Sequence, residues 1–188
     1  YSADFPEIMN KYGQRAVLYA HAGAGELHLR PILNLKKAKD RQLFYDISKD
    51  TALLVKKYGG SLSGEHGDGR VRAEFIPLMI GEKNYDLLKR LKATWDKNNI
   101  FNPNKIVDAK PMNKDLRYES DQETKQFNPI FDFSEQGGIL RAAEKCNGSG
   151  DCRKSHLAGG TMCPSYMATR NEKDTTRARA NVLREVLT

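Results

Sequence analysis

Residues 15–32 read RAVLYAHAGAGELHLRPI and have the pattern of two strands joined by a tight turn. Side chains on both arms alternate with a period of two, and after the turn Leu27 and Leu29 alternate with polar residues. The small residues at 22–25 supply the turn, and Pro31 favours an edge position or a strand end. The segment therefore predicts an antiparallel hairpin.

Two amphipathic helices are predicted after this hairpin. Between residues 36 and 58 the pattern changes to the helical period, and glycines at 59–60 end it. Its apolar face carries Leu43, Ile47, Leu54 and Tyr58. A short strand at 60–62 is predicted to lead into a glycine-rich loop at 63–69. The second helix is predicted from about 82 to 97. Its stripe consists of Tyr85, Leu88, Leu91, Lys92 and Trp95.

The last third of the chain has a different organisation. Residues 111–136 are polar and low in aliphatic side chains, which is typical of an interdomain linker. A short helix at 139–145 and a longer one at 175–187 are predicted beyond it. The apolar side of the longer helix consists of Ala178, Val182, Val186 and Leu187. We therefore expect an α+β domain over 1–110, with an antiparallel sheet and helices on one face. The linker then leads to a helical unit over 137–188.

The overall composition excludes several classes of protein. The chain has 188 residues, of which 39% are hydrophobic, so it can form a core and is neither collagen-like, mucin-like nor wholly disordered. No apolar run approaches the roughly 20 residues that a transmembrane helix needs. The net charge is +7, but basic and acidic residues are interleaved, which counts against nucleic-acid binding. Small anionic ligands fit this charge.

Three cysteines, Cys146, Cys152 and Cys163, cluster near one end of the chain. An odd, clustered set is not typical of a secreted disulfide framework, and favours metal or iron–sulfur ligation in the cytoplasm or at its membrane face. Positions 146, 149 and 152 have the steps of a bacterial ferredoxin motif, and Pro164 follows the last cysteine. However, the middle position is Ser149, and three thiols do not complete the usual set of four. Buried or zinc-binding thiols are the alternative.

Two histidines on the hairpin and an acid in the glycine-rich loop form a candidate metal site. If the turn is centred on residues 24–25, His21 lies opposite His28, with Cβ atoms roughly 4.5–5.5 Å apart. Glu65 and His66 are flanked by glycines, which allow a ligand to approach the backbone closely. Two imidazoles and one carboxylate match a catalytic metal site with an open position. The alternatives are a surface hairpin with incidental histidines and a plain polar turn.

Three motifs together resemble a known family. They are HAGAGELH at 21–28, SGEHGDG at 63–69 and FNPNKIV at 101–107. Their order and spacing are similar to those of the C-terminal, ferredoxin-like substrate domain of FAD-linked D-2-hydroxyacid oxidases. This group includes D-lactate dehydrogenases, glycolate oxidase flavoprotein subunits and D-2-hydroxyglutarate dehydrogenases. The resemblance implies an FAD-dependent oxidoreductase that converts a 2-hydroxyacid to the 2-oxoacid.

The resemblance also implies roles for individual residues. His21, His28 and Glu65 match the ligands of a divalent metal, for which zinc is expected. His66 matches the base that takes the α-hydroxyl proton while a hydride moves to the flavin. Asn102 is expected to contact the cofactor. Ala24, Glu26 and Arg30 differ from the Asp and two Asn that are frequent at these positions in relatives, so the particular substrate is left open.

The tail of the chain resembles a second module. The segments GGTMCPSY at 159–166 and RARAN at 177–181 look like the start of the ferredoxin-type iron–sulfur domain that follows the oxidase in some members. The resemblance implies that Cys146, Cys152 and Cys163 bind a 4Fe-4S cluster. This cluster would pass electrons from reduced flavin to an acceptor protein or a quinone.

The expected FAD-binding domain has no counterpart in these 188 residues. Together with the start at Tyr1 instead of Met, this favours a fragment that alone neither binds FAD tightly nor turns over substrate. Two other functions stay open. One is a metal-binding or electron-transfer partner subunit without flavin. The other is a metal-dependent hydrolase that uses His66 as its base.

Overall fold

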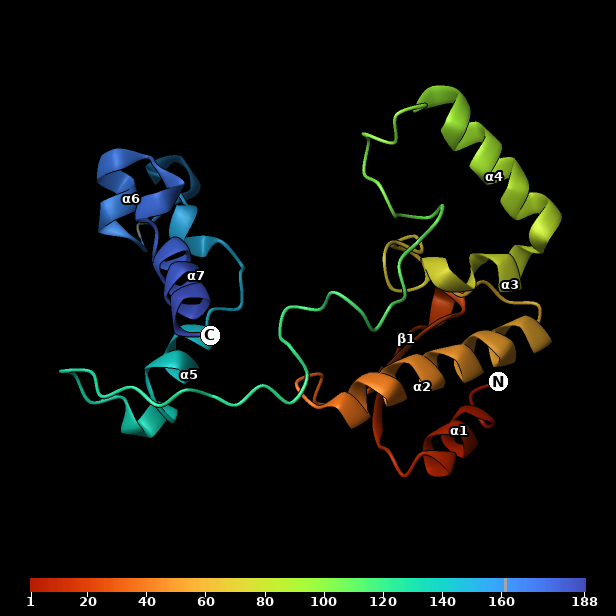
Figure 1. Cartoon of the computed structure of the whole chain (residues 1–188), viewed down its shortest axis with the longest axis horizontal. Coiled ribbons are helices and arrows are strands. Elements are labelled where there is room, and N and C mark those ends of the chain that lie inside the picture. Colours follow the sequence, from red (N-terminus) through yellow and green to blue (C-terminus); the bar gives the residue numbers. More distant parts are fainter. Residues whose placement is uncertain (161) are drawn as a thin grey trace. The chain divides into compact units, whose positions relative to one another are not determined.

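The computed structural model describes residues 1–160 and 162–188 and divides the chain into two compact units. Unit 1 is Tyr1–Gln122 and unit 2 is Glu123–Thr188, so the division falls inside the segment predicted as a linker (Figure 1). Thr161, which belongs to the tail motif, lies outside the described residues. None of the helices in the described ranges has the length and apolar character of a membrane span.

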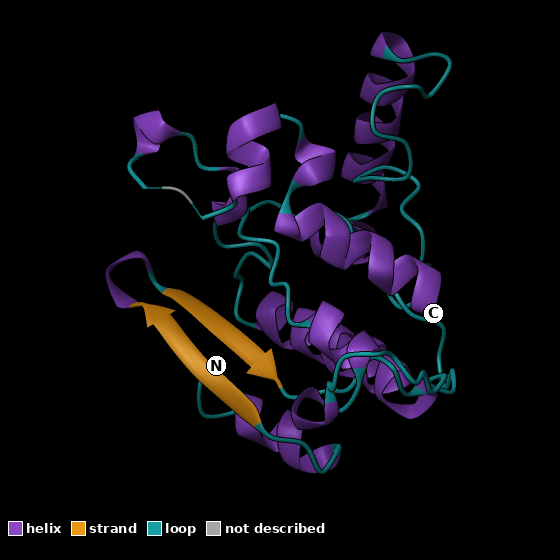
Figure 2. Ribbon diagram, turned by 90° about the vertical axis from the view of Figure 1, so that its left-hand side faces the viewer, coloured by secondary structure: helices purple, strands orange, loops and turns teal. Residues whose placement is uncertain are grey.

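The predicted hairpin is confirmed as a two-stranded antiparallel sheet, formed by β1 (Ala16–His21) and β2 (Glu26–Pro31), as Figure 2 shows. A single 3-10 turn, Ala22–Ala24, connects the strands, and Gly25 follows it in the left-handed region with φ 69°. His21 lies opposite Glu26, and Tyr19 lies opposite His28. The predicted pairing of His21 with His28 is therefore wrong, because the turn is centred one residue earlier than expected.

Four helices complete the regular structure of unit 1, in the order α1 (Phe5–Lys11), α2 (Ala38–Lys57), α3 (Ile76–Ile80) and α4 (Glu82–Trp95). The predicted helices at 36–58 and 82–97 are confirmed as α2 and α4, with ends that differ by a residue or two. The strand predicted at 60–62 does not form. Residues there pair with neither β1 nor β2, and a strand without a partner leaves its backbone groups without a ladder.

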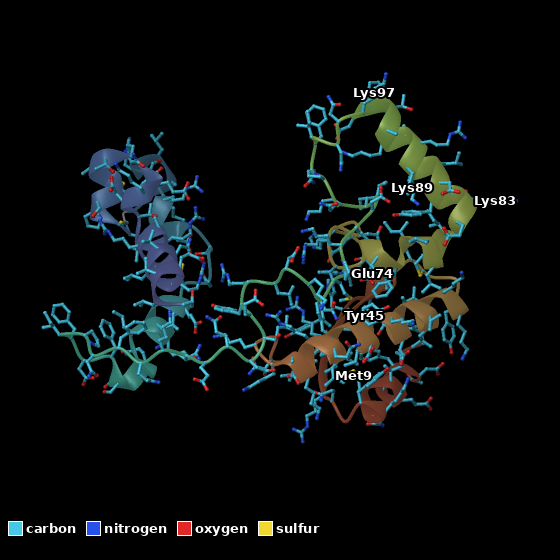
Figure 3. The ribbon with its side chains drawn as sticks, viewed as in Figure 1. Met9, Tyr45, Glu74, Lys83, Lys89 and Lys97 are labelled. Atoms are coloured by element: carbon cyan, nitrogen blue, oxygen red, sulfur yellow. The ribbon has the colours of Figure 1, made fainter. Side chains whose placement is uncertain are left out.

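The core of unit 1 lies on one face of the hairpin. Phe5 and Met9 of α1 pack with Ile47 and Leu54 of α2, and Ala16 and Leu29 of the strands pack against this cluster. Figure 3 labels Met9. Cross-strand partners share a face of a sheet. The other face therefore carries Tyr19, His21, Glu26, His28 and Arg30. The core covers the end of the first face that carries Ala16 and Leu29, and it leaves the polar face of the hairpin available for a functional site.

A second cluster in unit 1 involves the segment predicted as a linker. Met112 is fully buried against Ala52 and Phe75. Its backbone N–H donates a hydrogen bond to the carboxylate of Glu74 at 2.9 Å. Figure 3 labels Glu74. Met112 thus contributes to the core of unit 1.

Unit 2 contains α5 (Ile139–Glu144), α6 (Pro164–Thr169) and α7 (Thr176–Leu187). The helices predicted at 139–145 and 175–187 are confirmed as α5 and α7. Thr175 is fully buried and accepts a hydrogen bond from the Ala178 backbone N–H, which caps α7. Val182 and Val186 of the predicted apolar side are exposed, whereas Arg184 is buried. That part of the prediction is wrong, because the buried side of α7 includes Arg184 and not these two valines.

Candidate metal centre

The two hairpin histidines converge although they are not directly opposed. His21 ends β1 and His28 lies within β2, on the same face and diagonally across the ladder. Their ring centroids are 4.9 Å apart, with the rings nearly perpendicular at 77°. Diagonal neighbours on one face of a sheet lie within reach of large side chains. The hairpin therefore supplies two imidazoles to one place, as the sequence predicted.

Glu65 reaches the same place from the loop at 63–69. Its Oε1 atom lies 3.1 Å from Nε2 of His28 and 3.8 Å from Nε2 of His21. The same oxygen is 3.3 Å from Nε2 of His66. The backbone of this loop depends on two glycines, since Gly67 and Gly69 have φ of 71° and 56°. The structure thus brings together the four residues that the sequence singled out as candidates for this site, which are His21, His28, Glu65 and His66.

Glu26 is a member of the group that sequence reasoning missed. His21, Glu26, His28 and Glu65 each offer one donor atom, and these atoms lie within 4.8 Å of one another. This is the sole group of that kind within the ranges that the structure describes. The signal was present, because Glu26 and His28 are two apart on one strand and so share a face.

The donor chemistry of this group fits a divalent metal. Imidazole nitrogen and carboxylate oxygen are ordinary zinc ligands, at about 2.0–2.2 Å from the ion. His66 is differently placed, since its side chain is 81% exposed, whereas that of His28 is 27% exposed. The arrangement can therefore hold an ion with these four grouped donors and present the more exposed His66 imidazole beside it.

Comparison with known proteins identifies the family of the domain that carries this group. Residues 1–106 match the family model described as FAD linked oxidases, C-terminal domain. The chain belongs to the FAD-linked oxidase family. The matched residues include the whole hairpin and the loop that carries Glu65. No solved structure matches the chain.

Several curated relatives of this FAD-linked oxidase chain are named dehydrogenases. The D-2-hydroxyglutarate dehydrogenase of Pseudomonas putida is 36% identical over the whole chain, and that of Escherichia coli is 33% identical over the whole chain. The D-lactate dehydrogenase of Archaeoglobus fulgidus is 32% identical over 54% of the chain. The chain spans 18% of the first two relatives and 22% of the third.

The FAD-linked oxidase match ends within the motif that carries Asn102. Asn102 is exposed, with φ 51°, in the loop after α4. Asp96 holds the start of this loop, because its carboxylate accepts the backbone N–H groups of Ile100 at 2.8 Å and Phe101 at 2.9 Å. Lys92 donates to the same carboxylate, and this bond, with those from the loop, lowers the pKa of Asp96.

The three cysteines lie beyond the FAD-linked oxidase match, in unit 2. All are free thiols: Cys152 and Cys163 are buried and Cys146 is half-buried. The backbone N–H of Tyr166 and then the hydroxyl of Thr176 favour the thiolate and lower the pKa of Cys163. Among the described residues the cysteines do not form a close group of donors. Ser149 donates instead to the Asp151 carboxylate, at 3.3 Å.

Proposed function

We propose that the chain provides the metal-binding part of an FAD-dependent enzyme that oxidises a D-2-hydroxyacid to the 2-oxoacid. The observation that carries this proposal is the convergence of His21, His28 and Glu65 on one point of a family-matched domain. The reaction removes a hydride from the α-carbon, which FAD accepts, and a proton from the α-hydroxyl. The named dehydrogenase relatives support this class of substrate.

His66 is the proposed acceptor of the hydroxyl proton. A divalent metal bound beside it supplies Lewis-acid chemistry that lowers the pKa of a nearby hydroxyl. The imidazole of His66 is exposed, so substrate can reach it, and Glu65 lies 3.3 Å away. Glu65 thus orients His66 as well as serving the metal centre.

Arg30 is the proposed anchor for a carboxylate of the substrate. It lies two residues after His28 on the polar face of the hairpin, and its guanidinium is 5.0 Å from the centre of the Tyr19 ring. An exposed guanidinium held in this way binds carboxylates through paired, charge-assisted hydrogen bonds. Because D-2-hydroxyglutarate dehydrogenases match along the whole chain, we propose a dicarboxylate 2-hydroxyacid as the first substrate to test.

Anaerobic reduction of the flavin tests this function. In the flavoprotein that carries this chain, D-2-hydroxyglutarate is expected to bleach the flavin absorption, and L-2-hydroxyglutarate is expected to leave it unchanged. D-lactate and glycolate complete the panel. Flavin that stays oxidised with every acid would count against the proposal. A preparation without flavin but with an iron–sulfur spectrum would favour a partner subunit for electron transfer.

We further propose that Cys146, Cys152 and Cys163 bind an iron–sulfur cluster that takes electrons from the flavin and passes them to a protein or quinone. Their clustering in the sequence and the thiolate-favouring surroundings of Cys163 support ligation, and an odd, clustered set favours a reducing, cytoplasmic location. After anaerobic reconstitution with iron and sulfide, Cys152→Ser and Cys163→Ser are expected to lose the cluster absorption. Reconstituted spectra equal to wild type in both variants would contradict cysteine ligation.

A further inference from the structure

The position of Glu26 is not explained by the strand it begins. It is the first residue of β2, lies directly opposite His21, and is partly buried. A glutamate at a hairpin end ordinarily extends into water. Here one of its carboxylate oxygens instead lies within 4.8 Å of the donor atoms of His21, His28 and Glu65. Two negative groups close together repel each other unless a cation lies between them.

Gly64 leaves the space that Glu26 occupies. A Cβ atom at position 64 would lie 3.1 Å from Cγ and 3.2 Å from Cδ of Glu26, which is closer than carbon atoms normally approach. Unlike Gly67 and Gly69, Gly64 does not have a positive φ. Backbone conformation therefore does not require a glycine at 64, whereas the close approach of Glu26 does.

We propose that Glu26 is a fourth protein ligand of the metal centre and that Gly64 is the positioning residue that admits it. This inference rests on the proposed metal site at His21, His28 and Glu65. Two carboxylates together balance the charge of a divalent ion. A set of three ligands with only one carboxylate leaves one positive charge unbalanced. Four protein ligands close a zinc site, whereas a catalytic site keeps one position for water or substrate. Glu26 thus fills that position in the absence of substrate, and would leave the ion, or share a five-coordinate ion, when the substrate hydroxyl binds.

Zinc affinity of the full 188-residue chain tests this inference without any assay of turnover. The affinity is measured by competition with a chromogenic zinc chelator, and circular dichroism verifies the fold of each variant. Glu26→Gln is expected to weaken zinc binding roughly 10-fold or more, since even residues behind the ligands contribute on this scale. Gly64→Ala is expected to weaken it as well, because the added methyl displaces Glu26 while leaving its charge in the protein.

The double variant tests whether Gly64 affects zinc binding through its contact with Glu26. If Gly64 acts through Glu26, the Glu26→Gln/Gly64→Ala protein binds zinc no more weakly than Glu26→Gln alone. Gly23→Ala is the matched control, because a Cβ there meets nothing within 4 Å and its φ is not positive. It is expected to bind zinc as the wild type does.

Three results would overturn the inference, and the first two differ from failure of the metal site itself. Wild-type affinity in Glu26→Gln, together with loss of zinc in Glu65→Gln, would remove Glu26 from the ligand set and leave the site standing. Simple addition of the two effects in the double variant would overturn the role of Gly64. A wild-type chain that binds no zinc would overturn both this inference and the proposed metal centre.

Discussion

Replacing Glu65 by alanine is expected to remove the bound divalent metal and to lower oxidation of the 2-hydroxyacid by roughly 100-fold or more. Oε1 of Glu65 lies 3.1 to 3.8 Å from the Nε2 atoms of all three imidazoles of the site. Its loss takes away a proposed ligand and the proposed partner of His66 together. His21→Ala is expected to have the same effect on the metal. Metal content by mass spectrometry and flavin reduction by rapid mixing measure the two consequences.

Two further variants make this result specific. Glu82→Ala removes an exposed glutamate in the first turn of α4, outside the site, and should keep both metal and activity. His66→Ala should keep the metal, because His66 is not among the four grouped donors, but should slow turnover by about 100-fold or more. A Glu65→Ala protein with full metal content and wild-type rates would contradict the proposed site.

The hairpin shows how an error in the predicted register can leave a site prediction intact. The sequence placed His21 opposite His28, whereas the ladder places it opposite Glu26. This difference is a shift of two residues along the partner strand. Since side chains alternate with a period of two, such a shift keeps every residue on its face. The two imidazoles therefore still converge, and a shift of one residue would have separated them.

The contribution of Glu26 depends on contacts that a local pattern does not encode. The period of two places Glu26 beside His28, but its proximity to Glu65 requires the loop at 63–69 to lie across the end of the hairpin. Gly64, which makes room for Glu26, is 38 residues further along the chain, as the numbering shows. Only the fold brings these residues together.

Helical periodicity predicted the helices α2 and α4 but not which of their side chains are buried. Tyr85 of the predicted α4 stripe is buried, whereas Leu91 and Trp95 of the same stripe are 58% and 80% exposed. The short helices α1 and α3 were missed, because five to seven residues are too few to display a period. Proline near the start of each, at Pro6 and Pro77, was the available signal.

Replacing Phe5 by alanine is expected to destabilise unit 1 by about 3–5 kcal/mol. Phe5 is 1% exposed and lies at the centre of the cluster that joins α1, α2 and the hairpin. Removal of the ring leaves a cavity that the neighbouring side chains fill only in part. The loss is a large part of the roughly 5–15 kcal/mol by which domains are stable. Urea unfolding followed by circular dichroism measures it.

Phe101→Ala is the matched control, because the Phe101 ring is 71% exposed and the same atoms are removed. Its effect is expected to stay within about 0.5 kcal/mol. The Phe5 core lies on the face of the hairpin opposite to the metal group, so the two sites are linked through β1 and β2. Zinc should therefore raise the unfolding midpoint of Phe5→Ala, since a ligand that binds the folded state stabilises it. Equal midpoints for Phe5→Ala and Phe101→Ala would show that this cluster is not what holds the hairpin and its histidines in place.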